Sequence, residues 1–127
     1  LRSQFIDPVQ SESRVKSLLA SNPDAHALNF SLGNQYAQQA RWAEAQQAYF
    51  RAFGADPENP DYSYNLAVSL DHLFQAKPAL MYYQRAQQLL PARGGANLDP
   101  SALARRIAQL AAADAEAPAA SPAANSP

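Results

Sequence analysis

The chain has 127 residues, no cysteine and a formal net charge of −1 at pH 7. This length fits one domain with a modest core. The lack of cysteine excludes disulfides and thiol chemistry, and the small net charge gives no long-range field to collect nucleic acid or anionic lipid. No apolar run reaches the roughly 18 residues of a membrane span. The chain does not begin with methionine and has no signal-peptide pattern at its start, so we expect a fragment or a processed form.

The first predicted helix begins at Pro8, because proline is tolerated at the first helical position, where its missing N–H costs nothing. An apolar stripe follows at Val15, Leu18 and Leu19. The pair Asn22-Pro23 predicts the end of this helix.

Two further helices are predicted over residues 25–38 and 42–54, with Trp42 packing at the turn between them. Their inward-facing residues recur with the 3.6-residue period of a helix. They are Leu28, Leu32, Tyr36, Ala45, Tyr49, Ala52 and Phe53. Gly33 lies beside this stripe. Since glycine costs about 1 kcal/mol inside a helix, its position predicts that two helices approach closely there.

A second pair of helices is predicted over residues 60–73 and 77–90. Its inward stripe consists of Tyr62, Leu66, Leu70, Ala79, Tyr83, Ala86 and Leu90. Pro78 is acceptable in the first turn of a helix, and Pro91 is expected to end the pair.

The last predicted helix begins at Asp99-Pro100, with Leu103, Ile107 and Leu110 on one face. Arg105 and Arg106 lie off this face and are interpreted as solvated charges. From residue 111 onward the composition is Ala, Pro, Ser and Asn with two acids, which cannot bury enough surface to offset chain entropy.

The two pairs of helices are related by a constant shift of 34 residues, since Gly33 falls on Ala67 (67 − 33 = 34). Further matches at this shift are Leu32 with Leu66, Ala45 with Ala79, Tyr49 with Tyr83, Arg51 with Arg85, Ala52 with Ala86, and Pro57 with Pro91. A period of 34 is typical of a helix–turn–helix repeat. In this register the run Leu32-Gly33, Tyr36, Ala45, Tyr49, Ala52 and Pro57 resembles the tetratricopeptide repeat (TPR) signature.

The resemblance implies an all-α fold, a right-handed α–α superhelix (TPR solenoid) of antiparallel helix pairs with a C-terminal capping helix. The implied division is a partial repeat at 1–24, full repeats at 25–59 and 60–93, a capping helix at 94–112 and a disordered Ala/Pro-rich tail at 113–127. Because residues 1–24 match only the second helix of a repeat, we expect further repeats upstream.

In TPR proteins the first helices of the pairs form a concave wall that receives a partner peptide. Carried over by repeat position, the wall residues are Ala27, Phe30, Asn34, Ala37, Gln38, Asp61, Tyr64, Asn65, Val68, Asp71 and His72. Phe30 and Tyr64 are candidate anchors for a peptide side chain, with a core role as the open alternative. Asn34 and Asn65 are candidates for bonding a peptide backbone.

Other functions are disfavoured by the residues on this wall. It carries no lysine or arginine to hold the terminal carboxylate of a chaperone tail or the phosphates of nucleic acid, and Asp61 and Asp71 would repel both. His26 and His72 occupy unequal repeat positions, and Asp71 and His72 diverge on their helix. No phosphate loop, nucleophile elbow or metal-ligand spacing occurs, so we expect no enzyme, no cofactor and no metal.

The sequence therefore predicts a non-catalytic scaffold that binds a protein or peptide partner, without nucleic acid and without membrane insertion of this part of the chain. By analogy with other members of the family, the resemblance suggests a role in the assembly of bacterial pili or secretion machinery. The alternative is a structural spacer or a module that self-associates through its N-terminal end. The sequence is compatible with a location in the bacterial cytoplasm or in the periplasm.

Overall fold

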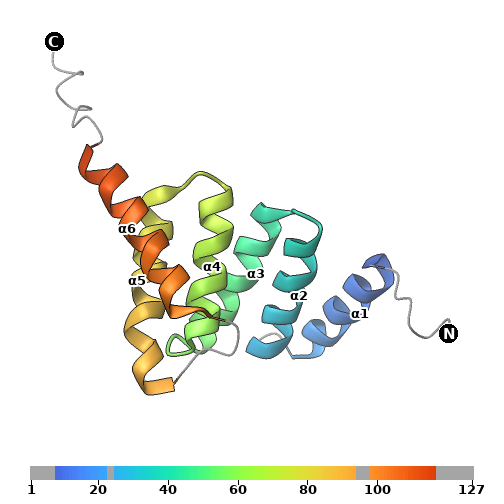
Figure 1. The fold of residues 1–127 in the computed structure, drawn as a ribbon. Coiled ribbons are helices and arrows are strands. Elements are labelled where there is room, and N and C mark those ends of the chain that lie inside the picture. Colours follow the sequence, from blue (N-terminus) through green and yellow to red (C-terminus); the bar gives the residue numbers. More distant parts are fainter. Residues whose placement is uncertain (1–7, 23–24, 94–97, 117–127) are drawn as a thin grey trace, which may run out of the picture.

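Six helices in a row make up the computed structural model, which describes residues 8–22, 25–93 and 98–116. The helices are α1 (Pro8–Ser21), α2 (His26–Gln38), α3 (Trp42–Ala55), α4 (Pro60–His72), α5 (Ala76–Arg93) and α6 (Pro100–Glu116). Each helix packs on the next one along the chain, and α1 and α6 lie at opposite ends of the row (Figure 1). The described residues contain no strand, which confirms the all-α helical-repeat fold.

The 34-residue period reappears in the bounds of the helices. The starts of α2 and α4 differ by 34 (60 − 26), as do their ends (72 − 38) and the starts of α3 and α5 (76 − 42). Even the turns correspond, because Ala40 and Phe74 (74 − 40 = 34) both have positive φ, at 57° and 61°. This left-handed conformation is unfavourable for residues other than glycine.

The core consists of tyrosines and leucines packed against small residues, as the stripes predict. Gly33 and Ala67 are both buried, and so are Tyr49 and Tyr83. A Cβ atom added to Gly33 would lie only 2.5 Å from Cε1 of Tyr49. The absent side chain is therefore what lets the tyrosine ring approach α2 so closely.

A charged cluster adds to the packing of α1 on the rest of the fold. Glu12 accepts hydrogen bonds from Arg41 at 2.8 Å and from the Tyr36 hydroxyl at 3.0 Å, and it pairs with Lys16 at 3.0 Å. The Lys16 ammonium and the Arg41 guanidinium lower the pKa of Glu12 from 4.5 to about 2. Of the predicted stripe, Val15 is buried, whereas Leu18 is 47% exposed.

The structure corrects the prediction that Pro91 ends the second pair, because α5 continues through Pro91 to Arg93. Pro91 removes the hydrogen bond that its N–H would donate to the backbone oxygen of residue 87, but only two residues of α5 follow it, so little of the helix is left to disrupt. Arg93 also donates two hydrogen bonds to Asp56, at 3.1 and 2.9 Å, and these hold the last turn in place.

The C-terminal helix α6 is also longer than predicted, since it continues to Glu116, beyond the expected end at residue 112. Residues 111–116 are all exposed, as expected from their composition. Alanine has the highest helix propensity, and extending an existing helix costs far less than starting one. Most of the predicted tail lies outside the described residues.

We predict that Gly33→Ala destabilises the fold. Overpacking against Tyr49 costs about 1–3 kcal/mol, which exceeds the ~1 kcal/mol that alanine returns in helix propensity. The matched control is Gly54→Ala in α3, where an added Cβ meets nothing within 4 Å. Thermal unfolding should show a lower Tm for Gly33→Ala and an unchanged or higher Tm for Gly54→Ala. Equal Tm values for the two variants would contradict the close approach.

We also predict that Glu12 stabilises the docking of α1 in a pH-dependent way. Its pKa in the folded chain lies below the ordinary value of 4.5. Its contribution is therefore complete above pH 4.5 and is lost as the pH falls through about 2. The Tm difference between the wild type and Glu12→Gln should thus be constant above pH 5 and shrink toward pH 2. Glu116→Gln, at the exposed end of α6, serves as control, and a pH-independent difference for Glu12→Gln would refute the prediction.

Candidate functional site

All eleven predicted wall residues lie on two helices, α2 and α4. Ala27, Gln38 and His72 are exposed, and the other eight are half-buried, so none belongs to the fully buried core. Side chains of the two helices meet directly, because the ring centroids of Phe30 and Tyr62 are 4.9 Å apart. We call this set of eleven residues the α2–α4 wall.

Two carboxamides on this wall are held in fixed orientations. The hydroxyl of Tyr49 donates to Oδ1 of Asn34 at 2.6 Å, and burial raises the pKa of Tyr49 to about 12, so it remains a donor. Asn65 donates from Nδ2 to the backbone oxygen of Asp61 at 2.8 Å. Within the described residues, Nδ2 of Asn34 and Oδ1 of Asn65 have no hydrogen-bond partner. The wall therefore offers one fixed amide donor group and one fixed acceptor.

The two predicted anchors also pack against the core. Phe30 lies against Tyr49 and Tyr62, with ring centroids 5.6 and 4.9 Å away. Tyr64 lies 5.8 Å from Tyr83. The alternative of a core role thus applies in part, because both rings pack against the core while the residues stay only half-buried.

Asp71 and His72 point to different partners, as predicted from their adjacent positions. Asp71 accepts from Arg106 at 2.6 and 2.7 Å and from the Tyr83 hydroxyl at 2.9 Å. The Arg106 guanidinium, and secondarily the Tyr83 hydroxyl, lower the pKa of Asp71. His72 stacks on Trp42 with ring centroids 3.8 Å apart and planes 3° from parallel. Both side chains are therefore engaged within the chain, and a pocket of about 300 Å³ lined by Asp71, His72, Phe74 and Arg106 lies beside them.

Sequence reasoning missed the role of Arg106, which had been interpreted as a solvated charge. The available signal was its position directly before Ile107 in the apolar stripe of α6, which places its side chain at the edge of the packed face. It also missed the stacking of His72 on Trp42, because these residues come from different helix pairs.

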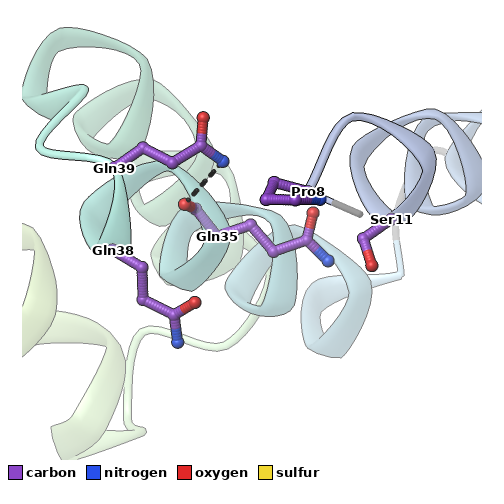
Figure 2. Close-up of a pocket in the computed structure, with 5 residues that line it drawn as sticks. All are labelled: Pro8, Ser11, Gln35, Gln38 and Gln39. Atoms are coloured by element: carbon purple, nitrogen blue, oxygen red, sulfur yellow. Dashed lines mark hydrogen bonds between the residues drawn. The ribbon is translucent and has the colours of Figure 1, made fainter. Parts of the chain in front are cut away.

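A polar pocket of about 450 Å³ lies between α1 and the end of α2 (Figure 2). Its lining residues are Pro8, Ser11, Gln35, Gln38 and Gln39. None of them is charged, and Gln39 donates to the backbone oxygen of Gln35 at 3.1 Å. The pocket extends the α2–α4 wall at its N-terminal edge, where the sequence had pointed to Gln38 alone.

Within the part of the chain that the structure describes, no group of three or more His, Asp or Glu side chains is placed to hold a metal ion. None of the described helices has the length and apolar character needed to span a membrane.

Comparison with solved structures identifies similar chains. MamA AMB-1 superposes with a TM-score of 0.68 at 24% identity, over 82% of this chain and 53% of MamA. MamA MSR-1 gives a TM-score of 0.67 at 22% identity, over 85% of this chain and 58% of its own. The fold is a TPR-type helical repeat. This chain thus spans somewhat more than half the length of either MamA structure.

No model of a protein family matches the sequence. No curated protein matches it either.

We predict that Arg106→Gln loosens α6. The ion pair is bidentate but partly exposed, so its loss should lower the free energy of unfolding by about 1 kcal/mol. Amide hydrogen exchange in α6 should accelerate more than exchange in α2 and α3. Arg105→Gln, an exposed neighbour on the same helix, is the control, and equal effects of the two variants would contradict the role of the Asp71 pair.

Proposed function

We propose that this protein is a non-catalytic scaffold that holds an extended segment of a partner protein along the α2–α4 wall. The observation that carries the proposal is the pair of oriented carboxamides. An extended peptide presents backbone C=O and N–H groups that match the open Nδ2 of Asn34 and the open Oδ1 of Asn65. Because both amides are already fixed, little side-chain entropy is lost on binding. The likeness in fold to MamA supports a scaffold of the TPR type.

The half-buried rings of Phe30 and Tyr64 supply the apolar part of this surface. Rigid aromatic side chains are effective anchors, because they bury a large area at low entropic cost. Their packing against core tyrosines keeps them rigid, which supports a dual role in packing and in binding.

The charges on the wall favour a neutral or basic partner segment. Among the eleven wall residues the charged ones are Asp61 and Asp71, and Asp71 is already neutralised by Arg106. An acidic peptide or a nucleic-acid backbone would meet no cation from these residues, so its charge would be desolvated without compensation.

A catalytic role is disfavoured by the partners of the histidines. His26 Nδ1 lies 2.8 Å from the Tyr62 hydroxyl, and His72 is stacked on Trp42. Neither histidine forms the nucleophile–base pair that general acid–base chemistry requires. By analogy with other TPR proteins, we propose that the scaffold acts in the assembly of bacterial pili or secretion machinery.

The second candidate function is self-association through the N-terminal end. Val9 is 69% and Leu18 is 47% exposed on α1, which is the outermost helix at that end (Figure 1). These exposed apolar side chains, on opposite sides of α1, support a role as a spacer or self-association module. Loss of association in a Val9→Ser, Leu18→Ser variant would favour it.

We predict that the variant Asn34→Asp, Asn65→Ala binds peptide more weakly. The new carboxylate at position 34 still accepts the hydrogen bond from Tyr49 but has lost the donor group. Each lost hydrogen bond should raise Kd about 2- to 10-fold, with the Tm nearly unchanged. Peptides selected from a random 12-residue display library on the full chain are the probe, and fluorescence anisotropy measures Kd.

The control for this experiment is Gln84→Ala, an exposed residue of α5 outside the wall. It should leave Kd unchanged. Selected peptides that bind the double variant as tightly as the wild type would place the binding surface elsewhere and overturn the proposal.

A further inference from the structure

The polar pocket between α1 and α2 has a counterpart at the next junction of the stack, between α3 and α4. The repeat shift of 34 residues (42 − 8) carries its lining residues onto that junction: Pro8 onto Trp42, Ser11 onto Ala45, Gln35 onto Ser69, Gln38 onto His72, and Gln39 onto Leu73. Pro8 and Trp42 are each the first residue of their helix. The two junctions therefore correspond position by position and differ in their side chains.

At the α3–α4 junction an aromatic ring occupies this position. The indole of Trp42 stacks on the imidazole of His72, with ring centroids 3.8 Å apart and planes 3° from parallel, and it also packs against the hydrophobic core. At the α1–α2 junction the corresponding residues are Pro8 and Gln38, which supply no aromatic ring. A pocket of about 450 Å³ lies there, within the ~300–1,000 Å³ of small-molecule sites. The pocket thus lies where the next repeat places an indole.

The lining of this pocket also includes a hydrogen-bond acceptor without a donor. Oε1 of Gln35 is buried and has no hydrogen-bond partner in the part of the chain that the structure describes. Figure 2 shows its carboxamide extended toward α1. Gln39 does not satisfy this oxygen, because its own amide donates to the backbone oxygen of Gln35 and accepts from Arg41. An unpaired buried acceptor is unfavourable, and the soft terminal torsion of glutamine lets Oε1 turn toward a donor in the pocket.

A tryptophan side chain matches both features of the pocket. Its indole is flat and largely apolar, and its single N–H donates a hydrogen bond without needing to accept one. None of the lining residues is charged, so a charged side chain would lose its hydration there without compensation.

We propose that this pocket receives a tryptophan of the partner segment, with the indole in the position that Trp42 has one repeat later and its N–H donating to Oε1 of Gln35. The inference rests on the proposed binding of such a segment, because Gln38 belongs both to the pocket and to the α2–α4 wall. It adds the side chain on which specificity depends, since an aromatic anchor in a fitted pocket often contributes much of the binding energy.

The probe for the pocket is N-acetyl-L-tryptophanamide, titrated into the isotope-labelled full chain. The side-chain amide signals of Gln35 and Gln38 should shift and saturate, with a Kd of about 1 mM for a single side chain. A derivative methylated at the indole nitrogen keeps the ring but has no N–H, so its Kd should be about 2- to 10-fold higher. In Gln35→Met, which lacks the amide oxygen, the two probes should bind equally. A wild type without saturable shifts, or one that binds both probes equally, would overturn the proposal.

Pro8→Trp tests the position of the ring. It places an indole at the start of α1, as Trp42 stands at the start of α3, so the pocket should be filled from within the chain. The Tm should be unchanged or higher, and the Kd of the probe should rise at least tenfold. Pro100→Trp, at the exposed first position of α6, is the matched control and should leave this Kd unchanged. Probe binding that persists in Pro8→Trp would contradict the assigned position.

Peptides selected from the random library connect the pocket with the wall. They should be enriched in tryptophan, and Pro8→Trp should raise their Kd at least tenfold. Peptides without this enrichment, or with the same Kd for Pro8→Trp as for the wild type, would refute the role of the pocket in partner binding. Failure of the wall proposal is distinguishable, because it is tested by Asn34→Asp, Asn65→Ala, whereas Pro8→Trp changes the pocket alone.

Discussion

The close approach of a tyrosine ring to a residue without a side chain is the contact on which this fold depends. Tyr49 lies against Gly33, and the residues one period later, Tyr83 and Ala67, are buried in the same core. A pair of helices cannot bury its apolar stripe alone, so each pair must pack on the next. The small residue sets how closely they pack. Leucines and alanines of both pairs then fill the remaining space at the same intervals.

The same tyrosines connect the core to the surface. Their rings are buried, but their hydroxyls reach the first helix of their own pair, where Tyr49 donates to Asn34 and Tyr83 donates to Asp71. In the first repeat this contact orients the amide of Asn34. In the second it helps to hold a carboxylate that binds Arg106 of α6. Equivalent core tyrosines thus orient an amide in one repeat and support the attachment of the C-terminal helix in the other.

The repeated part of this structure was predictable from the sequence. A stripe of tyrosine, leucine and alanine at helical spacing is buried when paired helices pack against each other. The start and end of α4, the position of Gly33 and the placement of the wall residues on α2 and α4 all follow from it. The continuation of α5 past Pro91 and of α6 to Glu116 did not follow. Each depends on cooperativity or on a distant contact such as that of Arg93 with Asp56.

Some ion pairs have no counterpart in the other repeat. They lie where one helix pair meets its neighbour or a terminal helix. Three ion pairs join residues 29 to 37 positions apart, and none has an equivalent at the 34-residue shift: Glu12 with Arg41, Asp56 with Arg93, and Asp71 with Arg106. They add directional contacts to a stack whose apolar contacts are nearly interchangeable between repeats. Such contacts fix which helix packs on which, since a wrong pairing would leave a partly buried charge uncompensated. Specific assembly of the stack thus depends on its irregular residues, while its shape comes from the repeated ones.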